Sequence, residues 1–259
     1  MTTKQPAATT SLNSSTSTKS SIARTPLAPT SLAPTSLAPT PTHKATHQAT
    51  AERKPNAVLS DMPIAGVLLY PGAGTDAQHP ALIALEEALR AEFVDLAVTR
   101  VDFPYRLEGR KLPDRAPKLV AAVHNQVSAF AKSLGVSTAA LVIGGRSMGG
   151  RMCSMAVAEG LRVAGLLCMS YPLHPPKKPE ALRIEHLPKV DVSSLFISGS
   201  RDDFGTPEEL RTHIDAIPGP AELVILEGKG HDLAKADAAI AMNTIKWLRK
   251  LQTFLLASH

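Results

Sequence analysis

A glycine-rich turn around Ser147 is the feature of the sequence that points most directly to chemistry. Gly145, Ser147 and Gly149 form a Gly-x-Ser-x-Gly pattern directly after the apolar run 139–143. A sharp turn from a strand into a helix needs small neighbours, because its backbone is strained and passes close to adjacent elements. We therefore expect the Ser147 hydroxyl at the start of a helix that begins at Met148, where developing negative charge is stabilised. The alternative is a turn with a serine that takes no part in chemistry.

A serine hydroxyl is too weakly acidic to attack an ester unaided, so it needs a general base and an acid that orients the base. In folds that place a nucleophilic serine on a turn from a strand into a helix, the order along the chain is serine, acid, histidine, and each residue lies just past a strand. Asp202 follows the apolar run 195–198, and His231 follows the run 223–226. Spacing favours Asp202 over Asp203 as the acid. The alternative is that the aspartates are solvated turn residues and His231 is an exposed loop histidine.

An oxyanion formed by attack on a carbonyl needs two backbone N–H donors. Met148, the residue after the serine, is expected to supply one of them. The loop 70–80 follows the first strong apolar run and is expected to supply the other. We assign this second donor to Ala73, because Gly72 and Gly74 allow the backbone to turn inward. An ordinary turn would explain the two glycines equally well.

Several basic side chains and histidines surround these candidates. Arg146 and Arg151 flank the serine, and the loop after the second apolar run contains Arg106, Arg110, Lys111 and Arg115. A cationic rim of this kind would select a substrate with a carboxylate or phosphate; the alternative is solvated charge and arginines paired with local carboxylates. His79 and His174 lie on loops near the expected strand ends and are candidates for substrate contact. Since the histidines lack metal-ligand spacing, we expect no metal and no cofactor.

The elements that must position these residues follow from hydrophobic periodicity. Short apolar runs alternate with helical patterns from about residue 56, which is typical of βαβ units around a parallel sheet. The runs lie at 64–70, 96–103, 139–143, 163–169, 195–198 and 223–226. One helical stripe comprises Leu119, Val123, Val127, Phe130 and Leu134, and another comprises Ile240, Trp247, Leu248, Leu251 and Leu255. A further helix is expected to start at Pro207, with Thr206 as its cap.

The first 55 residues have a different composition from the rest. They are rich in Thr, Ser, Pro and Ala, and a Leu-Ala-Pro-Thr repeat begins at Leu27, Leu32 and Leu37. Such a segment cannot bury enough apolar surface to offset its ordering entropy, and its prolines exclude a helix. We therefore expect a disordered tail over 1–55 and one domain over 56–259. A plain linker is favoured over an organellar targeting segment, because the first 50 residues contain only one arginine.

Composition restricts the partners of the domain. The 259 residues contain no run of about 18 apolar residues, so we expect no membrane association. The chain has two cysteines, Cys153 and Cys168, which are too few for the disulfide framework of a small secreted domain. We therefore expect a cytoplasmic protein in which both cysteines are small core residues. Four of the 28 basic residues precede Glu52, which leaves 24 basic against 23 acidic residues from there on. The domain therefore lacks the positive excess with which nucleic acid is bound.

The chain resembles the α/β-hydrolase fold, and within it the dienelactone-hydrolase-like domain shared by the testis-expressed protein 30 family and the third subunit of the NSL chromatin complex. The stretches that carry this resemblance are Pro-Gly-Ala-Gly at 71–74, Phe-Pro-Tyr at 103–105, Gly-Gly-Arg-Ser-Met-Gly-Gly-Arg at 144–151, Tyr-Pro-Leu-His-Pro-Pro at 171–176 and Gly-Ser-Arg-Asp-Asp-Phe-Gly-Thr at 199–206. Three departures stand out. Pro71 replaces a histidine in the oxyanion loop, Lys177 replaces a glycine, and a serine replaces the cysteine nucleophile of dienelactone hydrolases proper.

The resemblance implies a mostly parallel sheet flanked by helices, with little or no lid, and Ser147, Asp202 and His231 as nucleophile, acid and base. Together with the motif order, it predicts a serine hydrolase that cleaves a small ester or thioester, with a small-molecule acyl substrate as its partner. The alternative is a non-catalytic interaction module that keeps the fold. The oligomeric state and the natural substrate stay open at this point.

Overall fold

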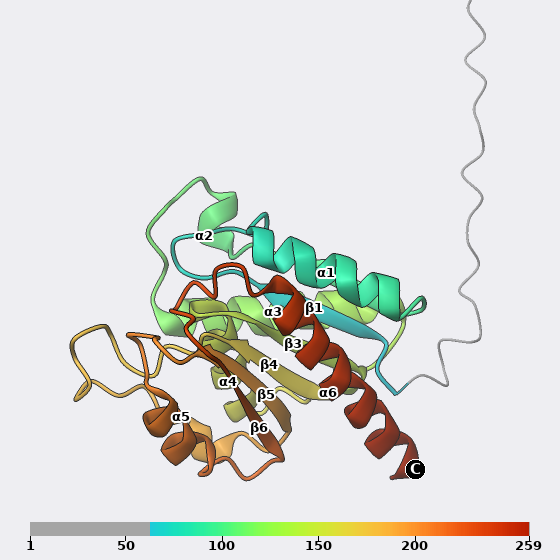
Figure 1. The fold of residues 1–259 in the computed structure, drawn as a ribbon. Coiled ribbons are helices and arrows are strands. Elements are labelled where there is room, and N and C mark those ends of the chain that lie inside the picture. The colour runs from blue at the N-terminus through green and yellow to red at the C-terminus, as the bar shows by residue number, and fades with distance from the viewer. Residues whose placement is uncertain (1–62, 259) are drawn as a thin grey trace, which may run out of the picture. The chain divides into compact units, whose positions relative to one another are not determined.

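The centre of the domain is a six-stranded sheet in which every neighbouring pair of strands is parallel (Figure 1). The structure is a computed structural model that describes residues 63–258, and the expected tail lies outside these residues. The strand order is β2-β1-β3-β4-β5-β6. The strands are β1 (Gly66–Tyr70), β2 (Ala97–Arg100), β3 (Leu141–Arg146), β4 (Gly165–Met169), β5 (Ser193–Gly199) and β6 (Ala221–Leu226). All six apolar runs of the sequence thus form strands, as predicted.

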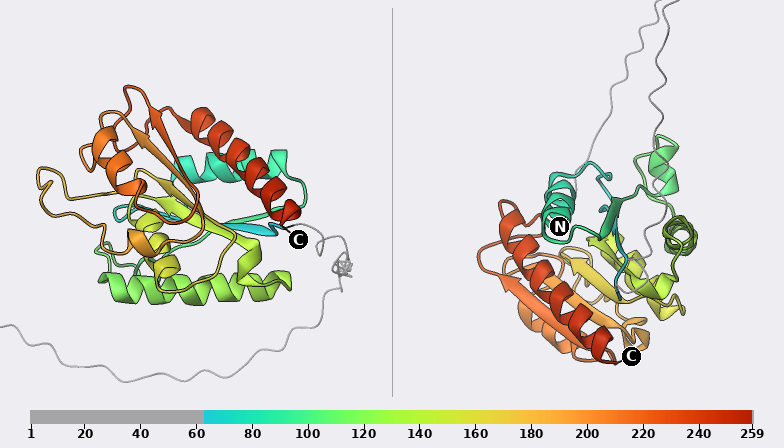
Figure 2. Two further views of the ribbon diagram at one scale, coloured as in Figure 1. Left: turned by 90° about the horizontal axis from the view of Figure 1, so that it is seen from below. Right: turned by 90° about the vertical axis from the view of Figure 1, so that its right-hand side faces the viewer.

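Helices cover both faces of this sheet, as Figure 2 shows. One face carries α1 (Pro80–Glu92) and α6 (Asp237–Ala257), and the other carries α3 (Ala116–Leu134), α4 (Met148–Ala158) and α5 (Pro207–Ile214). A short helix, α2 (Pro104–Leu107), lies in the connection after β2. Two short 3-10 helices are formed by Thr138–Ala140 and Leu187–Lys189.

Side chains of β1 show how the two cores are divided. Leu68 and Tyr70 point into the cluster beneath α3, α4 and α5, while Val67 and Leu69 point into the cluster beneath α1 and α6. A strand covered on both faces is apolar at every position rather than at every second one. This explains why the strands were visible in the sequence as uninterrupted apolar runs.

The two predicted helical stripes face the sheet. Three residues of the first stripe, in α3, are fully buried, and Phe130 and Leu134 pack against the same core. In α6, Leu255 is partly buried and the other four stripe residues are buried. The cap at Thr206 is confirmed as a capping box with Glu209. Within 63–258, no helix combines the length and apolar character needed to cross a membrane.

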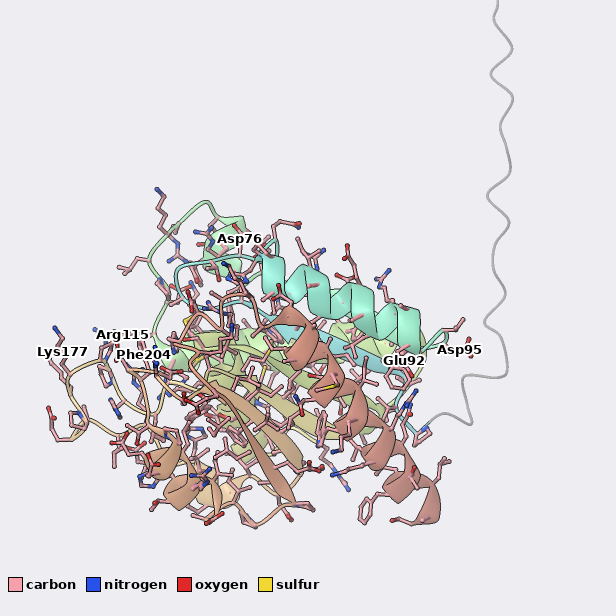
Figure 3. All side chains as sticks on the ribbon, in the orientation of Figure 1. Asp76, Glu92, Asp95, Arg115, Lys177 and Phe204 are labelled. Carbon is pink, nitrogen blue, oxygen red and sulfur yellow. The ribbon has the colours of Figure 1, made fainter. Side chains whose placement is uncertain are left out.

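Both cysteines are small core residues, as expected. Cys153 and Cys168 are free and fully buried, and burial raises the pKa of each thiol. The departure at Lys177 has a conformational consequence, because this residue has a φ of 62°, which glycine adopts more readily than lysine. Figure 3 shows Lys177 at the same end of the domain as Arg115 and Phe204, whereas Glu92 and Asp95 lie at the opposite end.

The strand order fixes where a site can form. In the sheet, β2 lies on one side of β1, and β3 followed by β4 lies on the other. The connection after β1 therefore leads toward one edge of the sheet, whereas the connection after β3 leads toward the opposite edge. Ligands of open α/β sheets bind at such a switch point, outside the carboxyl ends of the strands. The loop around Ala73 follows β1 and Ser147 follows β3, so both lie at this position.

Candidate active site

Ser147 occupies a strained turn between β3 and α4. Its φ is 51° and its ψ is −116°, outside the conformations that L residues prefer. A Cβ on Gly145 would collide with the carbonyl oxygen of Tyr70, and one on Gly149 would lie 2.5 Å from the same oxygen. The Ser147 N–H donates to the carbonyl of Met169, at the end of β4, over 2.7 Å. The turn is therefore held between β1 and β4, which explains why the sequence has glycine on both sides of the serine.

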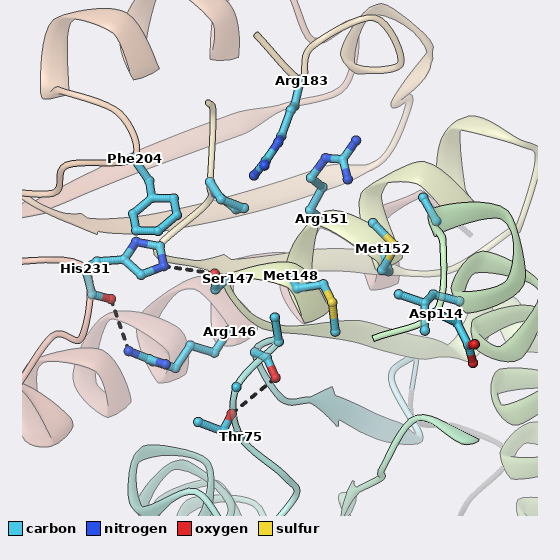
Figure 4. A pocket seen from close by; sticks show the side chains of 16 residues that line it. Thr75, Asp114, Arg146, Ser147, Met148, Arg151, Met152, Arg183, Phe204 and His231 are labelled. Atoms are coloured by element: carbon cyan, nitrogen blue, oxygen red, sulfur yellow. Dashed lines mark hydrogen bonds between the residues drawn. The ribbon is translucent and has the colours of Figure 1, made fainter. Parts of the chain in front are cut away.

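His231 and Asp202 lie next to this serine. The Nε2 atom of His231 is 2.9 Å from the Ser147 Oγ, as the dashed line in Figure 4 marks. Its Nδ1 atom is 2.9 and 3.0 Å from the two carboxylate oxygens of Asp202. The Asp202 side chain is completely buried, whereas Asp203 is exposed to solvent. The structure thus brings together the three side chains that sequence spacing singled out, and it places Asp202 rather than Asp203 beside the histidine.

Two further groups hold the Asp202 carboxylate in place. The N–H of Phe204 donates to Oδ1 over 2.9 Å, and the Ser198 hydroxyl donates to Oδ2 over 3.2 Å. Both carboxylate oxygens therefore have a partner besides His231. Hydrogen bonds of this kind hold a buried carboxylate in one orientation. No motif of the sequence selects Ser198. The one feature that could have indicated it is its position at the end of the apolar run 195–198.

Two contacts hold His231 in place, one to its side chain and one to its backbone. The Phe204 ring stacks on the imidazole, with the ring centroids 3.9 Å apart and the planes 26° apart. A guanidinium nitrogen of Arg146 donates to the His231 carbonyl oxygen over 3.2 Å. Burial lowers the pKa of Arg146, and the nearby charges of Asp232 and Asp202 oppose this shift. Arg146 lines the cavity beside Ser147, and its observed contact is with the histidine loop.

The predicted oxyanion loop passes directly beside the serine. A Cβ on Gly72 would lie 3.6 Å from the Cβ of Ser147, which is ordinary van der Waals contact. The carbonyl of Ala73 accepts a hydrogen bond from the buried Tyr105 hydroxyl at 3.1 Å. Among residues 63–258, no acceptor is found for the N–H of Ala73 or of Met148. Neither predicted donor is thus taken up by another group of the described residues, and Ala73 and Met148 line the same cavity.

That cavity has a volume of about 520 Å³, which is within the range of small-molecule sites. Its walls come from the oxyanion loop, the first turns of α3 and α4, the two connections on either side of β5, and the loop of His231. Figure 4 shows Met148 and Met152 on one side of the serine and Phe204 with His231 on the other. Apolar side chains therefore border the serine on one side, while the charged side chain of Arg146 also lies close to it.

Two of the six basic residues considered in the sequence have carboxylate partners. Arg106 pairs with Asp76 at 3.0 Å, and Arg110 pairs with Asp114 at 2.9 Å and with Glu108. Lys111 and Arg115 are exposed and do not line the cavity. Arg151 lines the cavity, and so does Arg183, which no motif of the sequence indicated.

The two candidate histidines lie elsewhere. His79 caps the start of α1, where its Nδ1 accepts the N–H of Ala81 over 3.2 Å. His174 is buried, with Nδ1 2.8 Å from the carbonyl of Pro175 and Nε2 3.4 Å from Glu209. Neither lines the cavity, so the structure does not bring them to the expected substrate position. Across 63–258, no group of three or more His, Cys, Asp or Glu side chains is arranged to hold a metal ion.

Comparison with known proteins agrees with the fold. A family model described as an alpha/beta hydrolase domain matches residues 63–252. Among solved structures, the chain is similar to Est1E from Butyrivibrio proteoclasticus (16% identity, 74% of this chain and 92% of that chain, TM-score 0.58). It is also similar to a dienelactone hydrolase from Anabaena variabilis (18%, 72% and 86%, 0.57) and to the esterase PE8 (20%, 72% and 92%, 0.56). At these identities the likeness to the solved structures shows the fold alone.

Proposed function

Since the chain belongs to the alpha/beta hydrolase domain family, we propose that it is a serine hydrolase that cleaves a small ester or thioester through Ser147, His231 and Asp202. The observation that supports this most is the chain of contacts from the serine Oγ to His231 and on to a buried carboxylate. A nucleophile within hydrogen-bond reach of a base, which is itself oriented by an acid, is the arrangement that covalent catalysis by serine requires.

The first step is attack on the carbonyl carbon of the substrate. His231 accepts the Ser147 proton at Nε2 while Oγ forms a bond to this carbon. The carbonyl oxygen then carries the negative charge, and the N–H groups of Ala73 and Met148 donate to it. Because these donors have no acceptor within 63–258, they need not break existing bonds to receive the oxyanion.

The second step expels the alcohol or thiol. The tetrahedral intermediate collapses, the bond to the leaving group breaks, and His231 returns its proton to that group. The product that stays behind is an ester between the acyl group and Ser147. A water molecule then gives a proton to His231 while its oxygen bonds to the carbonyl carbon of this ester. The bond to Ser147 Oγ breaks, His231 returns the proton to Oγ, and the free acid leaves.

Asp202 acts through the histidine. With Nδ1 held by the carboxylate, His231 presents Nε2 to the serine in the tautomer that accepts a proton, and the imidazolium formed in each step is stabilised by the buried negative charge. Ser198 and the Phe204 N–H keep that carboxylate oriented. We therefore regard Ser198 and Phe204 as positioning residues.

The cavity favours small substrates. Its volume of about 520 Å³ accommodates a ligand of a few tens of atoms at most. The apolar side chains of Met148, Met152 and Leu119 provide a surface for a short hydrocarbon or aromatic portion.

Labelling with a fluorophosphonate probe tests the proposal, because such probes react with activated serines. We expect labelling of the full-length wild-type protein and loss of it in Ser147→Ala. Ser133→Ala is the matched control, since Ser133 is exposed on α3 and its hydroxyl bonds only the carbonyl of Phe130 in the described residues. Absence of labelling in a folded wild-type protein would overturn the proposal and favour a non-catalytic interaction module.

A further inference from the structure

Two arginines on the wall of the cavity have no carboxylate partner within 63–258. Arg151 lies on α4, and Arg183 lies in the connection between β4 and β5; both line the cavity of Ser147 and His231 (Figure 4). None of the ion pairs of the described residues involves either side chain. This sets them apart from Arg106 and Arg110, whose guanidinium groups are already neutralised.

Their charges act on each other and on their neighbours. Burial and the charge of Arg151 lower the pKa of Arg183, and the same two causes lower the pKa of His186 to about 4. His186 is therefore neutral near pH 7 and adds no third cation. The Nε of Arg151 is buried and has no hydrogen-bond partner in the described residues. Two like charges in a partly buried place are costly unless an anion joins them.

The backbone on both sides of this pair is fixed. The N–H of Arg183 donates to the carbonyl of Leu173 over 2.8 Å, and its own carbonyl accepts from the Tyr171 hydroxyl over 3.1 Å. The carbonyl of Arg151 accepts from Ser154 Oγ at 2.8 Å, and this hydroxyl in turn lies 2.8 Å from His186 Nε2. The guanidinium groups thus project from rigid positions, which lowers the entropy cost of holding a ligand.

We propose that Arg151 and Arg183 form an anion subsite that binds a carboxylate or phosphate group of the ester or thioester substrate. This inference rests on the proposed hydrolase function. Guanidinium groups match carboxylate and phosphate oxygens in geometry and bind them with paired hydrogen bonds. The N–H of Arg151 donates to the carbonyl of Ser147, so Arg151 lies one helical turn beyond the serine, and both residues line the same cavity.

The other charged groups of the cavity do not compete for this anion. Asp114 also lines the cavity, but its carboxylate is held by Arg110 and by Lys118, at 2.9 and 3.1 Å. Arg146 also lacks a carboxylate partner among the described residues, but its guanidinium donates to the His231 carbonyl, and the charges of Asp232 and Asp202 act on it. Arg151 and Arg183 are therefore the two cavity arginines whose guanidinium groups have neither a carboxylate nor a carbonyl acceptor within 63–258.

The test compares esters of similar size and shape that differ in charge. One series places the anion on the leaving group: 4-carboxyphenyl acetate, 4-acetoxyphenyl phosphate and the neutral 4-carbamoylphenyl acetate. The other places it on the acyl group: the monophenyl ester of adipic acid and the phenyl ester of adipamic acid. We expect kcat/KM of the full-length wild-type protein to favour the anionic member of at least one series by about 10- to 100-fold at low salt. Preference for phosphate over carboxylate, or the reverse, identifies the anion.

Variants assign the preference to the two arginines. Arg151→Gln and Arg183→Gln should each reduce the ratio of anionic to neutral kcat/KM by about tenfold or more. Arg162→Gln removes an equal charge from an exposed residue outside this cavity and should leave the ratio unchanged. Arg151→Lys keeps the positive charge but lacks the planar guanidinium group, so it should show an intermediate ratio of anionic to neutral kcat/KM. Because this variant is a conservative replacement, it distinguishes loss of the anion contact from a folding defect. Equal turnover of charged and neutral esters by the wild type in both series would overturn the subsite.

Failure of the subsite and failure of the hydrolase can be told apart. Turnover of the neutral esters and fluorophosphonate labelling report on the hydrolase alone. If neither occurs, binding of 4-carboxyphenyl acetate and of monophenyl adipate to Ser147→Ala is measured by calorimetry, alone and combined with each arginine variant. Binding that is lost with Arg151→Gln or Arg183→Gln but kept with Arg162→Gln would support the subsite without hydrolysis. Absence of binding, or binding that neither variant weakens, would overturn it.

Discussion

The Phe204 ring lies flat on the imidazole of His231, with centroids 3.9 Å apart, while the Phe204 N–H holds the carboxylate that orients the same histidine. One residue thus fixes the candidate base both through its side chain and through its backbone. The side chain can be removed without losing the backbone contact, which makes its contribution measurable.

Replacing Phe204 with Ala should lower kcat about tenfold, because His231 would leave its position beside the serine more often. The measurement is steady-state kinetics on a neutral ester, with Phe204→Tyr as the control that keeps an aromatic ring. Full kcat in Phe204→Ala would show that the stack does not position the histidine.

Tyr105 provides a similar test of the oxyanion loop. Tyr105→Phe removes the hydroxyl that donates to the Ala73 carbonyl but keeps the buried ring. We expect a loss of kcat of about tenfold with little change in KM, because the Ala73 N–H is used most in the transition state. If KM rises instead while kcat is kept, the hydroxyl serves ground-state binding and the assignment of Ala73 is wrong.

The strained turn predicts a large effect on stability. Gly145→Ala places a Cβ against the Tyr70 carbonyl, and neither backbone segment can move away without disturbing β1 and β3. We expect a loss of about 3 kcal/mol or more in the free energy of unfolding, measured by denaturant titration. Gly74→Ala is the control, since nothing lies within 4 Å of a Cβ there, and it should change stability by less than about 0.5 kcal/mol. If Gly145→Ala and Gly74→Ala had the same free energy of unfolding, the close contact between Gly145 and the Tyr70 carbonyl would be contradicted.

His186 makes stability depend on pH. Burial and the Arg151 charge lower its pKa to about 4 in the folded state, whereas an unfolded chain has a histidine pKa of about 6.5. The unfolded state therefore takes up a proton first, and stability is lost as the pH falls from about 6.5 to about 4. The total contribution is about 3 kcal/mol. His186→Gln should flatten the dependence of unfolding free energy on pH in this window, and an unchanged slope would contradict the assignment.

Much of the fold was predictable because residues such as Leu68 and Leu69 are buried on opposite faces of a covered sheet, which leaves an uninterrupted apolar signal. The candidate triad was predictable for a related reason. Carboxyl ends of parallel strands meet at one edge, so residues just after β3, β5 and β6 converge there whatever their separation along the chain.

The site residues that could not be predicted from the sequence lie mostly in irregular segments. Arg183 reaches the cavity from the connection between β4 and β5, where no periodicity indicates which side chains point inward. His174, in the same connection, is buried against Glu209 instead of facing the cavity. Ser198 lies near the end of β5, and only the three-dimensional position of Asp202 gives its hydroxyl a partner. Side-chain direction in such segments is set by long-range packing, which leaves little local trace in the sequence.

The most direct measurement of the central claim is to trap the acyl-enzyme. Full-length protein mixed with excess 4-carbamoylphenyl acetate is quenched in acid within milliseconds to seconds and examined by intact mass spectrometry and peptide fragmentation. We predict one acetyl group on Ser147, which appears before steady state, decays when the ester is exhausted and is absent in Ser147→Ala. Hydrolysis without an adduct on Ser147, or an adduct on another residue with Ser147→Ala fully active, would contradict the account.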